Sequence, residues 1–303
     1  MRTTLLSIFF AAILGAVSVS KAAEDDGGSV KVALQYEGTQ LALSFIDNSG
    51  GQSLDFVPDN PDMAKIGVQY KKIGASFGSS VKAQDERYNI SSTCRDIQLF
   101  YYSKQFGGDL YYQAYKGYYV DTTPVLPEDL YPNLKIRTYT GSLYYKINGN
   151  VDLSALSDTL ASDKSPKRLL FAIASLSDRA ISSDKPLVPA ALRQNFPDFV
   201  SLKRFHSINP SLSVGYLLPV SWTHTYLNSS LSVGLGYPVL DTNIGLKQSY
   251  SIKVNLKIRA GYERGKFSYG FAAVADSDAV EMKNEEAVQF ISMAANLFVA
   301  CKF

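Results

Sequence analysis

The chain has 303 residues and a formal net charge of only +2. Its Lys and Arg residues form no block that could follow a phosphate backbone, so nucleic acid is excluded as a partner. With 20 Tyr and 16 Phe the chain is rich in aromatic residues, while its mean hydropathy is close to zero. A helical membrane protein would be more apolar, whereas a membrane β-barrel averages near zero because lipid-facing and water-facing residues alternate along its strands.

Residues 1–22 have the features of a secretory signal peptide. Arg2 precedes an apolar run over residues 5–17, and a small-x-small cleavage site ends at Ala22. The run is shorter than the roughly 20 apolar residues that a spanning helix needs. We therefore predict that the mature chain is exported and is not anchored at its front.

Residues 23–52 precede the predicted barrel domain, residues 53–303. The stretches 31–36 and 41–45 alternate in the way that strands do. This N-terminal segment is interpreted as a periplasmic tail, a plug or the first strand, and the sequence leaves the three alternatives open.

Residues 95–119 carry the most specific motif of the chain. They read Arg-Asp-Ile-Gln-Leu-Phe-Tyr-Tyr over 95–102 and Asp-Leu-Tyr-Tyr-Gln-Ala-Tyr-Lys-Gly-Tyr-Tyr over 109–119, and Asp-Phe-Val-Pro-Asp-Asn precedes them over 55–60. The combination resembles an uncharacterised bacterial outer-membrane β-barrel family, the domain of unknown function 4421, from about residue 30 to the end. The resemblance implies a barrel, and because that family has no established activity it implies no catalytic residue.

From residue 53 onward, period-2 alternation divides the chain into strand-length segments. The clearest segment covers residues 251–262, and Tyr clusters and Trp222 fall near segment ends, where membrane barrels carry aromatic girdles. Short and long connections alternate, as they do between the periplasmic turns and external loops of such barrels. These features predict an all-β fold, a transmembrane antiparallel up-and-down β-barrel.

The strand count depends on the middle and the front of the chain. A turn at 148–150 followed by a strand at 151–159 leaves one strand missing further on. A short strand at 199–204 would restore the alternation of sides, and another at 53–59 would put the N-terminus back in the periplasm, which gives about fourteen strands. Without both, about twelve are visible directly. We therefore predict about 12–14 strands, an even number.

The segment 177–206 is expected to be a long connection, because it contains Pro186, Pro189 and Pro197. It suggests one alternative function, that of a structural or adhesive surface barrel whose loop binds an external partner. The same segment could instead fold inward as a plug.

The chain has two histidines, His206 and His224. An outer-membrane lipid-acting enzyme would need a Ser and a His with an orienting partner. Ser221 and Ser229 are the serines near His224 that could serve as the nucleophile. Ser221 and His224 lie at a predicted turn, and there is no nucleophile elbow. A non-enzymatic role is therefore preferred, with the lipid-acting enzyme kept as an alternative.

No cofactor site is predicted, and no metal-ligand spacing stands out. Asp276 and Asp278 lie in a stretch, 276–286, that is expected to be a solvated loop, with weak divalent-cation binding as a lesser alternative. Cys94 and Cys301 are expected at opposite ends of the barrel and therefore unpaired, because a disulfide needs Cα atoms within about 7 Å.

One set of side chains suggests a binding function. Lys253, Asn255, Lys257 and Arg259 share the polar parity of the 251–262 segment, and basic rows inside a pore favour anionic solutes. The alternative is that they pair with lumen carboxylates and fill a narrow barrel. Lys146 and Lys302 are candidates to extend the row.

The last fifteen residues, 289–303, alternate between an apolar and a mixed parity and end at Phe303. A terminal aromatic residue on such a strand resembles the signal that outer-membrane barrels present to their assembly machinery. The sequence as a whole thus predicts a bacterial outer-membrane barrel in contact with the lipid bilayer. Its predicted role is a channel or uptake pore for small hydrophilic or anionic solutes.

Overall fold

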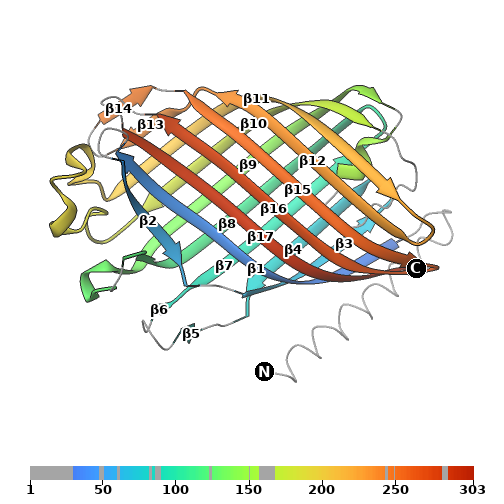
Figure 1. The fold of residues 1–303 in the computed structure, drawn as a ribbon, viewed down its shortest axis with the longest axis horizontal. Coiled ribbons are helices and arrows are strands. Elements are labelled where there is room, and N and C mark those ends of the chain that lie inside the picture. The colour runs from blue at the N-terminus through green and yellow to red at the C-terminus, as the bar shows by residue number, and fades with distance from the viewer. Residues whose placement is uncertain are drawn as a thin grey trace.

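The computed structural model describes residues 30–47, 51–59, 62–81, 84–85, 90–122, 125–149, 151–156, 168–242, 245–248, 250–281 and 286–303. The predicted signal peptide lies outside these ranges. Within them the chain forms a closed antiparallel β-barrel whose strands are tilted against its long axis (Figure 1). No helix in the described ranges is long and apolar enough to cross a membrane.

Twelve long strands form the wall among the described residues. Each pairs antiparallel with its neighbours in chain order, and the ring closes where β1 pairs with β17. The predicted up-and-down barrel is thus confirmed, with the lower of the two strand counts. The wall strands are β1 Val30–Asp47, β3 Asp62–Tyr70, β4 Ile73–Ser80, β7 Thr93–Tyr102, β8 Phe106–Val120, β9 Leu130–Gly149, β10 Leu169–Ser182, β11 Arg204–Ser221, β12 Thr225–Gly236, β15 Ser251–Arg264, β16 Phe267–Glu281 and β17 Glu286–Lys302.

The N-terminal segment supplies the first wall strand. Of the three alternatives, tail, plug or strand, the described part of 23–52 forms β1, which is hydrogen-bonded to β17 along its whole length. The barrel therefore begins at Val30 and not at residue 53.

Five short strands lie at the end of the barrel away from the termini: β2 Gln52–Pro58, β5 Gln84–Asp85, β6 Ile90–Ser91, β13 Val239–Thr242 and β14 Gly245–Gln248. The short strand predicted at 53–59 exists as β2, but it does not span the wall. It pairs with the end of β1 on one side and with the end of β8 on the other, beyond the point where β3, β4 and β7 stop.

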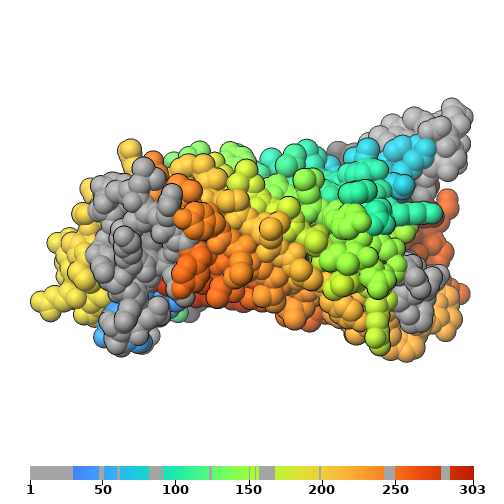
Figure 2. Space-filling model, turned by 90° about the horizontal axis from the view of Figure 1, so that it is seen from above, coloured from blue at the N-terminus to red at the C-terminus, as the bar shows by residue number. Residues whose placement is uncertain are grey.

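The two faces of the wall differ in chemistry because side chains alternate across it. Large apolar residues are exposed all around the outside, and Leu143 and Leu212 reach 70% exposure. A surface of this kind in water would be a large unpaired apolar patch. The outer face therefore lies against a lipid bilayer, and the polar parity of each strand faces the lumen. Figure 2 shows this wall from another side.

Connection lengths distinguish the two ends of the barrel. The termini meet at one end, where the amide of Phe303 donates to the carbonyl of Val30 at 2.8 Å. Turns at this termini end are mostly short, as at 71–72 and 265–266, whereas long connections such as 183–203 lie at the opposite, loop end. This is the asymmetry expected of periplasmic turns and external loops.

A plug fills the loop end. The connection 183–203, which we call the plug, contains the helical turns η3 Ala190–Leu192 and η4 Pro197–Phe199 and lies over this end of the barrel (Figures 1 and 2, yellow). Five of its apolar side chains are at most 1% exposed: Leu187, Val188, Phe196, Phe199 and Leu202. They join one hydrophobic core with residues of β1, β2, β8, β9, β10, β11, β13, β16 and β17.

The strand predicted at 199–204 is absent, because residues 197–199 form η4 and β11 begins at Arg204. The other predicted boundary of this segment was also wrong. Residues 177–182 belong to the wall strand β10 and not to a loop.

A smaller structure, the cap, covers part of the termini end. It comprises residues 151–156 with the helical turn η2 Leu153–Leu156, where a strand over 151–159 was predicted. Its buried apolar side chains form one core with residues of β7, β10 and β11, and Tyr144 of β9 and Ile173 of β10 pack against this core. The wall residues of the core are Phe100, Tyr102, Leu169, Phe171 and Leu217. The remaining described connection with a helical turn is η1 Pro127–Asp129, at the loop end.

Candidate functional site

Between the plug and the cap lies a polar cavity of about 230 Å³. All four residues predicted as a basic row line it: Lys253, Asn255, Lys257 and Arg259. They point inward from β15 because they occupy alternate positions, while the residues between them are exposed on the outer face. The cavity is smaller than the roughly 300–1,000 Å³ of drug-sized ligand sites, so it suits ions and very small solutes.

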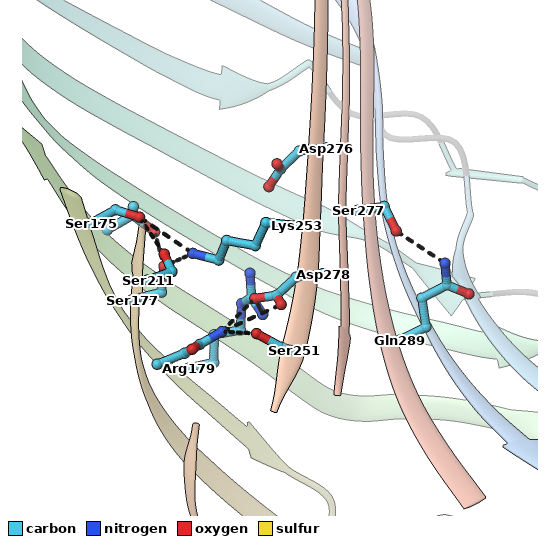
Figure 3. Close-up of polar contacts among 12 residues, drawn as sticks. Ser175, Ser177, Arg179, Ser211, Ser251, Lys253, Asp276, Ser277, Asp278 and Gln289 are labelled. Atoms are coloured by element: carbon cyan, nitrogen blue, oxygen red, sulfur yellow. Dashed lines mark hydrogen bonds and ion pairs between the residues drawn. The ribbon is translucent and has the colours of Figure 1, made fainter. Parts of the chain in front are cut away.

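Lys253 lies beside a wall of serines. Its Nζ atom donates to Ser177 Oγ at 3.2 Å and lies 3.5 Å from Ser175 Oγ, both on β10 (Figure 3). Ser175 Oγ in turn lies 2.7 Å from Ser211 Oγ on β11. Further serines of β11 and β12 line the same side: Ser213, Ser230 and Ser232. Hydroxyl groups both donate and accept hydrogen bonds, so this wall can solvate an anion beside the lysine.

A buried ion pair lies between Lys253 and the plug. The Arg179 guanidinium of β10 donates to Asp278 Oδ2 of β16 at 2.5 Å, and both side chains are almost fully buried. Asn209 Nδ2 donates to the same oxygen at 3.0 Å and to Ser251 Oγ at 2.8 Å. Arg179 also stacks on Phe290, 4.5 Å from the ring centroid. A buried charge needs such partners, and here they link β10 to the opposite strands.

This network corrects the interpretation of Asp276 and Asp278. They belong to β16, which continues to Glu281, and not to a solvated loop. Asp276 lines the cavity and accepts from Asn255 Nδ2 at 3.4 Å, while Asp278 is fully buried. In the described ranges no group of three or more His, Cys, Asp and Glu residues is arranged to hold a metal ion.

A second buried pair lies on the other side of the lumen. Lys65 Nζ is 3.5 Å from Asp96 Oδ2, and the Tyr111 hydroxyl donates to the same oxygen at 2.6 Å. Asp109, nearer the cap, accepts hydrogen bonds from the hydroxyls of Tyr102 and Tyr144 at 3.2 and 2.9 Å. Carboxylates on this side are thus held by tyrosines as well as by a lysine.

The lumen cavity carries both signs of charge. The cavity is lined by the cations Lys65, Arg179, Lys253, Lys257 and Arg259 and by the carboxylates Glu37, Asp109 and Asp276. Asp96 and Asp278 lie behind the lining and pair with Lys65 and Arg179. The other three cations stand on one strand, β15, next to the serine wall. Asp276 and Asp278 stand on the neighbouring strand β16, whereas Glu37 and Asp109 belong to β1 and β8.

The remaining predicted residues lie away from the lumen cavity. His206 Nε2 is 3.0 Å from Asp178 Oδ1, and both side chains are about half exposed. The His224 ring contacts the Tyr262 ring at 5.6 Å between centroids, in the turn between β11 and β12. Lys302 is exposed at the termini end, and Phe303 packs beside Val30, Val32 and Tyr70 at the same end.

Cys94 and Cys301 are both free, as expected from their separation. Cys94 is buried in the core below the plug, and Cys301 is half-buried near the termini.

Sequence reasoning missed Arg179 because the segment 177–206 was interpreted as a loop. The signal was present, since Ser177, Arg179 and Ile181 continue the inward parity of the preceding residues of β10. The adjacent charged residues Asp178 and Arg179 near the end of β10 are typical of the beginning of a loop, which explains the misassignment.

The chain matches one protein-family model and is similar to several solved structures. A family model described as Domain of unknown function (DUF4421) matches residues 24–303. A comparison with curated proteins finds no match. Among solved structures, the β domain of the Bordetella autotransporter BrkA is 10% identical, with 91% of this chain and 99% of that chain covered and a TM-score of 0.37.

Two channels are also similar. The Pseudomonas putida toluene transporter TodX is 8% identical, with 91% and 89% of the two chains covered and a TM-score of 0.29. An anion-selective porin from Comamonas acidovorans is 10% identical, with 91% and 100% covered and a TM-score of 0.20.

Proposed function

The chain belongs to the DUF4421 family, whose description names no activity, and we propose its function from the geometry of the lumen. The protein is a bacterial outer-membrane channel for small hydrophilic solutes, prefers anions, and is closed at rest by the plug. It carries out no catalysis. Export through residues 1–22 and assembly through Phe303 belong to the same proposal.

One observation carries this function, namely the row of cations on β15 beside the serine wall. Lys253, Lys257 and Arg259 face one cavity from a single strand. An anion in this place meets ammonium and guanidinium groups together with serine hydroxyls, which replace its hydration shell. Lys65 and Arg179 are held in ion pairs with Asp96 and Asp278. The proposal therefore rests on the number of cations on β15, where Lys253 also lies beside Asp276 and Asp278 of β16.

The plug supports a closed resting state. It joins a hydrophobic core that involves strands around most of the barrel, and water and ions do not pass through a close-packed apolar layer. The intact protein should therefore conduct little until the plug is displaced or removed.

The test is conductance in a planar bilayer. We would compare the mature protein with a plug-deletion variant, in which a short Gly-Ser linker replaces residues 185–201, and measure ion selectivity in a salt gradient. The variant is expected to conduct in stable steps with an anion preference, and the intact protein to conduct little. Lys253→Gln with Lys257→Gln in the plug-deletion variant should lower the anion preference.

Lys72→Gln with Lys266→Gln is the matched control, because it removes two exposed cations from turns outside the lumen. A folded plug-deletion variant that passes no current, or that prefers cations, would overturn the proposal. If the deletion prevents folding, the milder Phe196→Ser with Phe199→Ser tests the same point.

The lipid-acting alternative is tested separately. His224→Ala should leave any lipid release from vesicles by the purified protein unchanged, because the described contact of the His224 ring is with Tyr262. A loss of lipid release in this variant would restore the enzyme hypothesis.

A further inference from the structure

Four cations form a cluster on the outer face of the barrel, near the loop end. We call Arg95 of β7, Lys116 of β8 and Lys135 and Arg137 of β9 the basic cluster. All four side chains are exposed, and all four have the outward parity of their strands.

The strand register brings these residues together. Lys116 stands directly opposite Lys135. We call a row of residues that stand opposite one another on neighbouring strands a rung. In the next outward-facing rung towards the middle of the barrel, Arg95 and Arg137 stand opposite Ala114 from either side. Neighbouring strands are about 4.8 Å apart, so the four cationic groups lie within reach of one small anionic group.

The repulsion among these four cations is unfavourable unless a bound anion offsets their charge. Like charges directly opposite each other destabilise a pair of strands, and in the described ranges no carboxylate pairs with any member of the basic cluster. The nearest outward carboxylates lie on other strands. Asp178 of β10 is engaged by His206. Asp62 of β3, two strands from β7, accepts a hydrogen bond from the Tyr36 hydroxyl. Asp241 of β13 lies three strands beyond β9 in the register.

The rungs below the basic cluster are apolar and aromatic. Ile97 pairs with Tyr112, and Tyr112 with Tyr139, and the two tyrosine rings lie 4.7 Å apart on the outer face. The next rung carries Leu99 and Leu110, which are 51% and 61% exposed. Tyrosines of this kind mark the level of the lipid headgroups, so the basic cluster lies at headgroup height with the acyl region directly beneath it.

We propose that the basic cluster binds the phosphate groups of a phosphorylated glycolipid in the outer leaflet. Arginine recognises phosphate through two parallel hydrogen bonds, and lysine adds point charge. Several acyl chains of the same lipid then lie along the Tyr112, Tyr139 and Leu110 surface. The inference rests on the proposed outer-membrane location and orientation, and it does not depend on conduction through the lumen.

Native mass spectrometry of the folded barrel in detergent tests the proposal, with bisphosphorylated lipid A as the probe and its dephosphorylated form as comparison. The cluster variant carries Arg95→Gln, Lys116→Gln, Lys135→Gln and Arg137→Gln. A matched control variant removes four exposed cations from turns at the termini end: Lys72→Gln, Lys104→Gln, Arg264→Gln and Lys266→Gln. Heat-dependent mobility on a gel verifies that each variant is folded.

The intact protein and the control variant are expected to bind the phosphorylated lipid at least about tenfold more tightly than the cluster variant does. The dephosphorylated lipid should bind all three equally weakly. Arg95→Lys with Arg137→Lys, which keeps the charge, should retain most of the binding.

Three results would overturn the proposal. One is equal binding of phosphorylated and dephosphorylated lipid by the intact protein. Another is unchanged binding by the folded cluster variant. The third is complete displacement of the lipid by inorganic phosphate at low concentration, which would assign the basic cluster to a free anion. Because lipid binding is measured in a closed barrel, its failure would leave the conductance experiment unaffected.

Discussion

The plug and the cap close the two ends of one barrel in different ways. The plug buries five large apolar side chains in a core shared with strands all around the loop end, and its neck is tied by backbone hydrogen bonds between Ser183 and Lys203 and between Leu187 and Leu202. The cap packs against one side of the wall. The loop end is therefore closed by the hydrophobic core itself, whereas the termini end is covered only where the cap contacts the nearby wall strands.

The largest expected loss of stability follows from a substitution among the buried side chains of the plug. Phe199 is fully buried and lies 4.6 Å from Phe45 between ring centroids, so Phe199→Ala should lower the free energy of unfolding by about 3–5 kcal/mol. Urea unfolding of the barrel in lipid vesicles, followed by circular dichroism, measures this change. A loss below about 1 kcal/mol would show that the plug is not part of the core.

A core substitution in the cap should lower the free energy of unfolding less than one in the plug. Leu153 is also fully buried, but it belongs to a short segment that can detach without opening the wall. We expect Leu153→Ala to cost about 2 kcal/mol, the lower end for such a substitution, and to raise the hydrogen exchange of the cap alone. Accelerated exchange throughout the wall strands would contradict the local character of this contact.

A smaller effect is expected where the plug meets β9. The Tyr131 hydroxyl lies 3.1 Å from the carbonyl oxygen of Pro186 and 3.0 Å from that of Leu187. Tyr131→Phe keeps the ring and removes this donor, so it should cost about 1 kcal/mol. The same unfolding experiment applies, and an unchanged midpoint would mean that water replaces the hydroxyl.

The smallest expected effect is a pH dependence of stability where the plug joins the wall, close to the hydrogen bond between Ser183 and Lys203. Asn133 Nδ2 donates to Asp184 Oδ2 at 2.9 Å, and this hydrogen bond lowers the pKa of Asp184. Because the folded pKa lies below the unfolded value of about 3.9, the contribution to stability is complete above that value. It is lost as the pH falls through the folded pKa.

For a side chain this exposed, the contribution should not exceed roughly 0.5 kcal/mol. Asn133→Ala should therefore remove a small part of the acid sensitivity of the melting temperature. If the variant and the intact protein lose stability equally between about pH 5 and pH 3, the hydrogen bond from Asn133 to Asp184 does not contribute to the pH dependence of stability.

Alternation along the chain was sufficient to predict the wall. The segment 251–262 was recognised as a strand, and the structure extends it only to Arg264. The closing segment from Gln289 likewise lies within β17, and the inward side of both strands follows from their pattern. A strand with one face in lipid must keep charged side chains off that face, because each would cost roughly 2–4 kcal/mol near the bilayer midplane.

Prediction failed where local pattern and tertiary contact diverge. Residues 151–159 alternate like a strand, yet the described part turns into the lumen, because packing Val151 and Leu153 against Phe171 buries them more completely. Residues 276–281 are polar like a loop, yet Asp278 is accommodated in a strand by the guanidinium of Arg179.

Alternation in the chain is therefore enough to predict the class of fold, the lipid-facing and lumen-facing sides of the strands, and the placement of Lys253, Lys257 and Arg259 on one face. Which side chains meet across the lumen or along a rung is known only from the folded barrel. Arg179 and Asp278 are 99 positions apart in the chain, and Lys116 faces Lys135 only because of the register between β8 and β9. The physical reason is that alternation acts between neighbouring residues, whereas barrel closure and register depend on all strands at once.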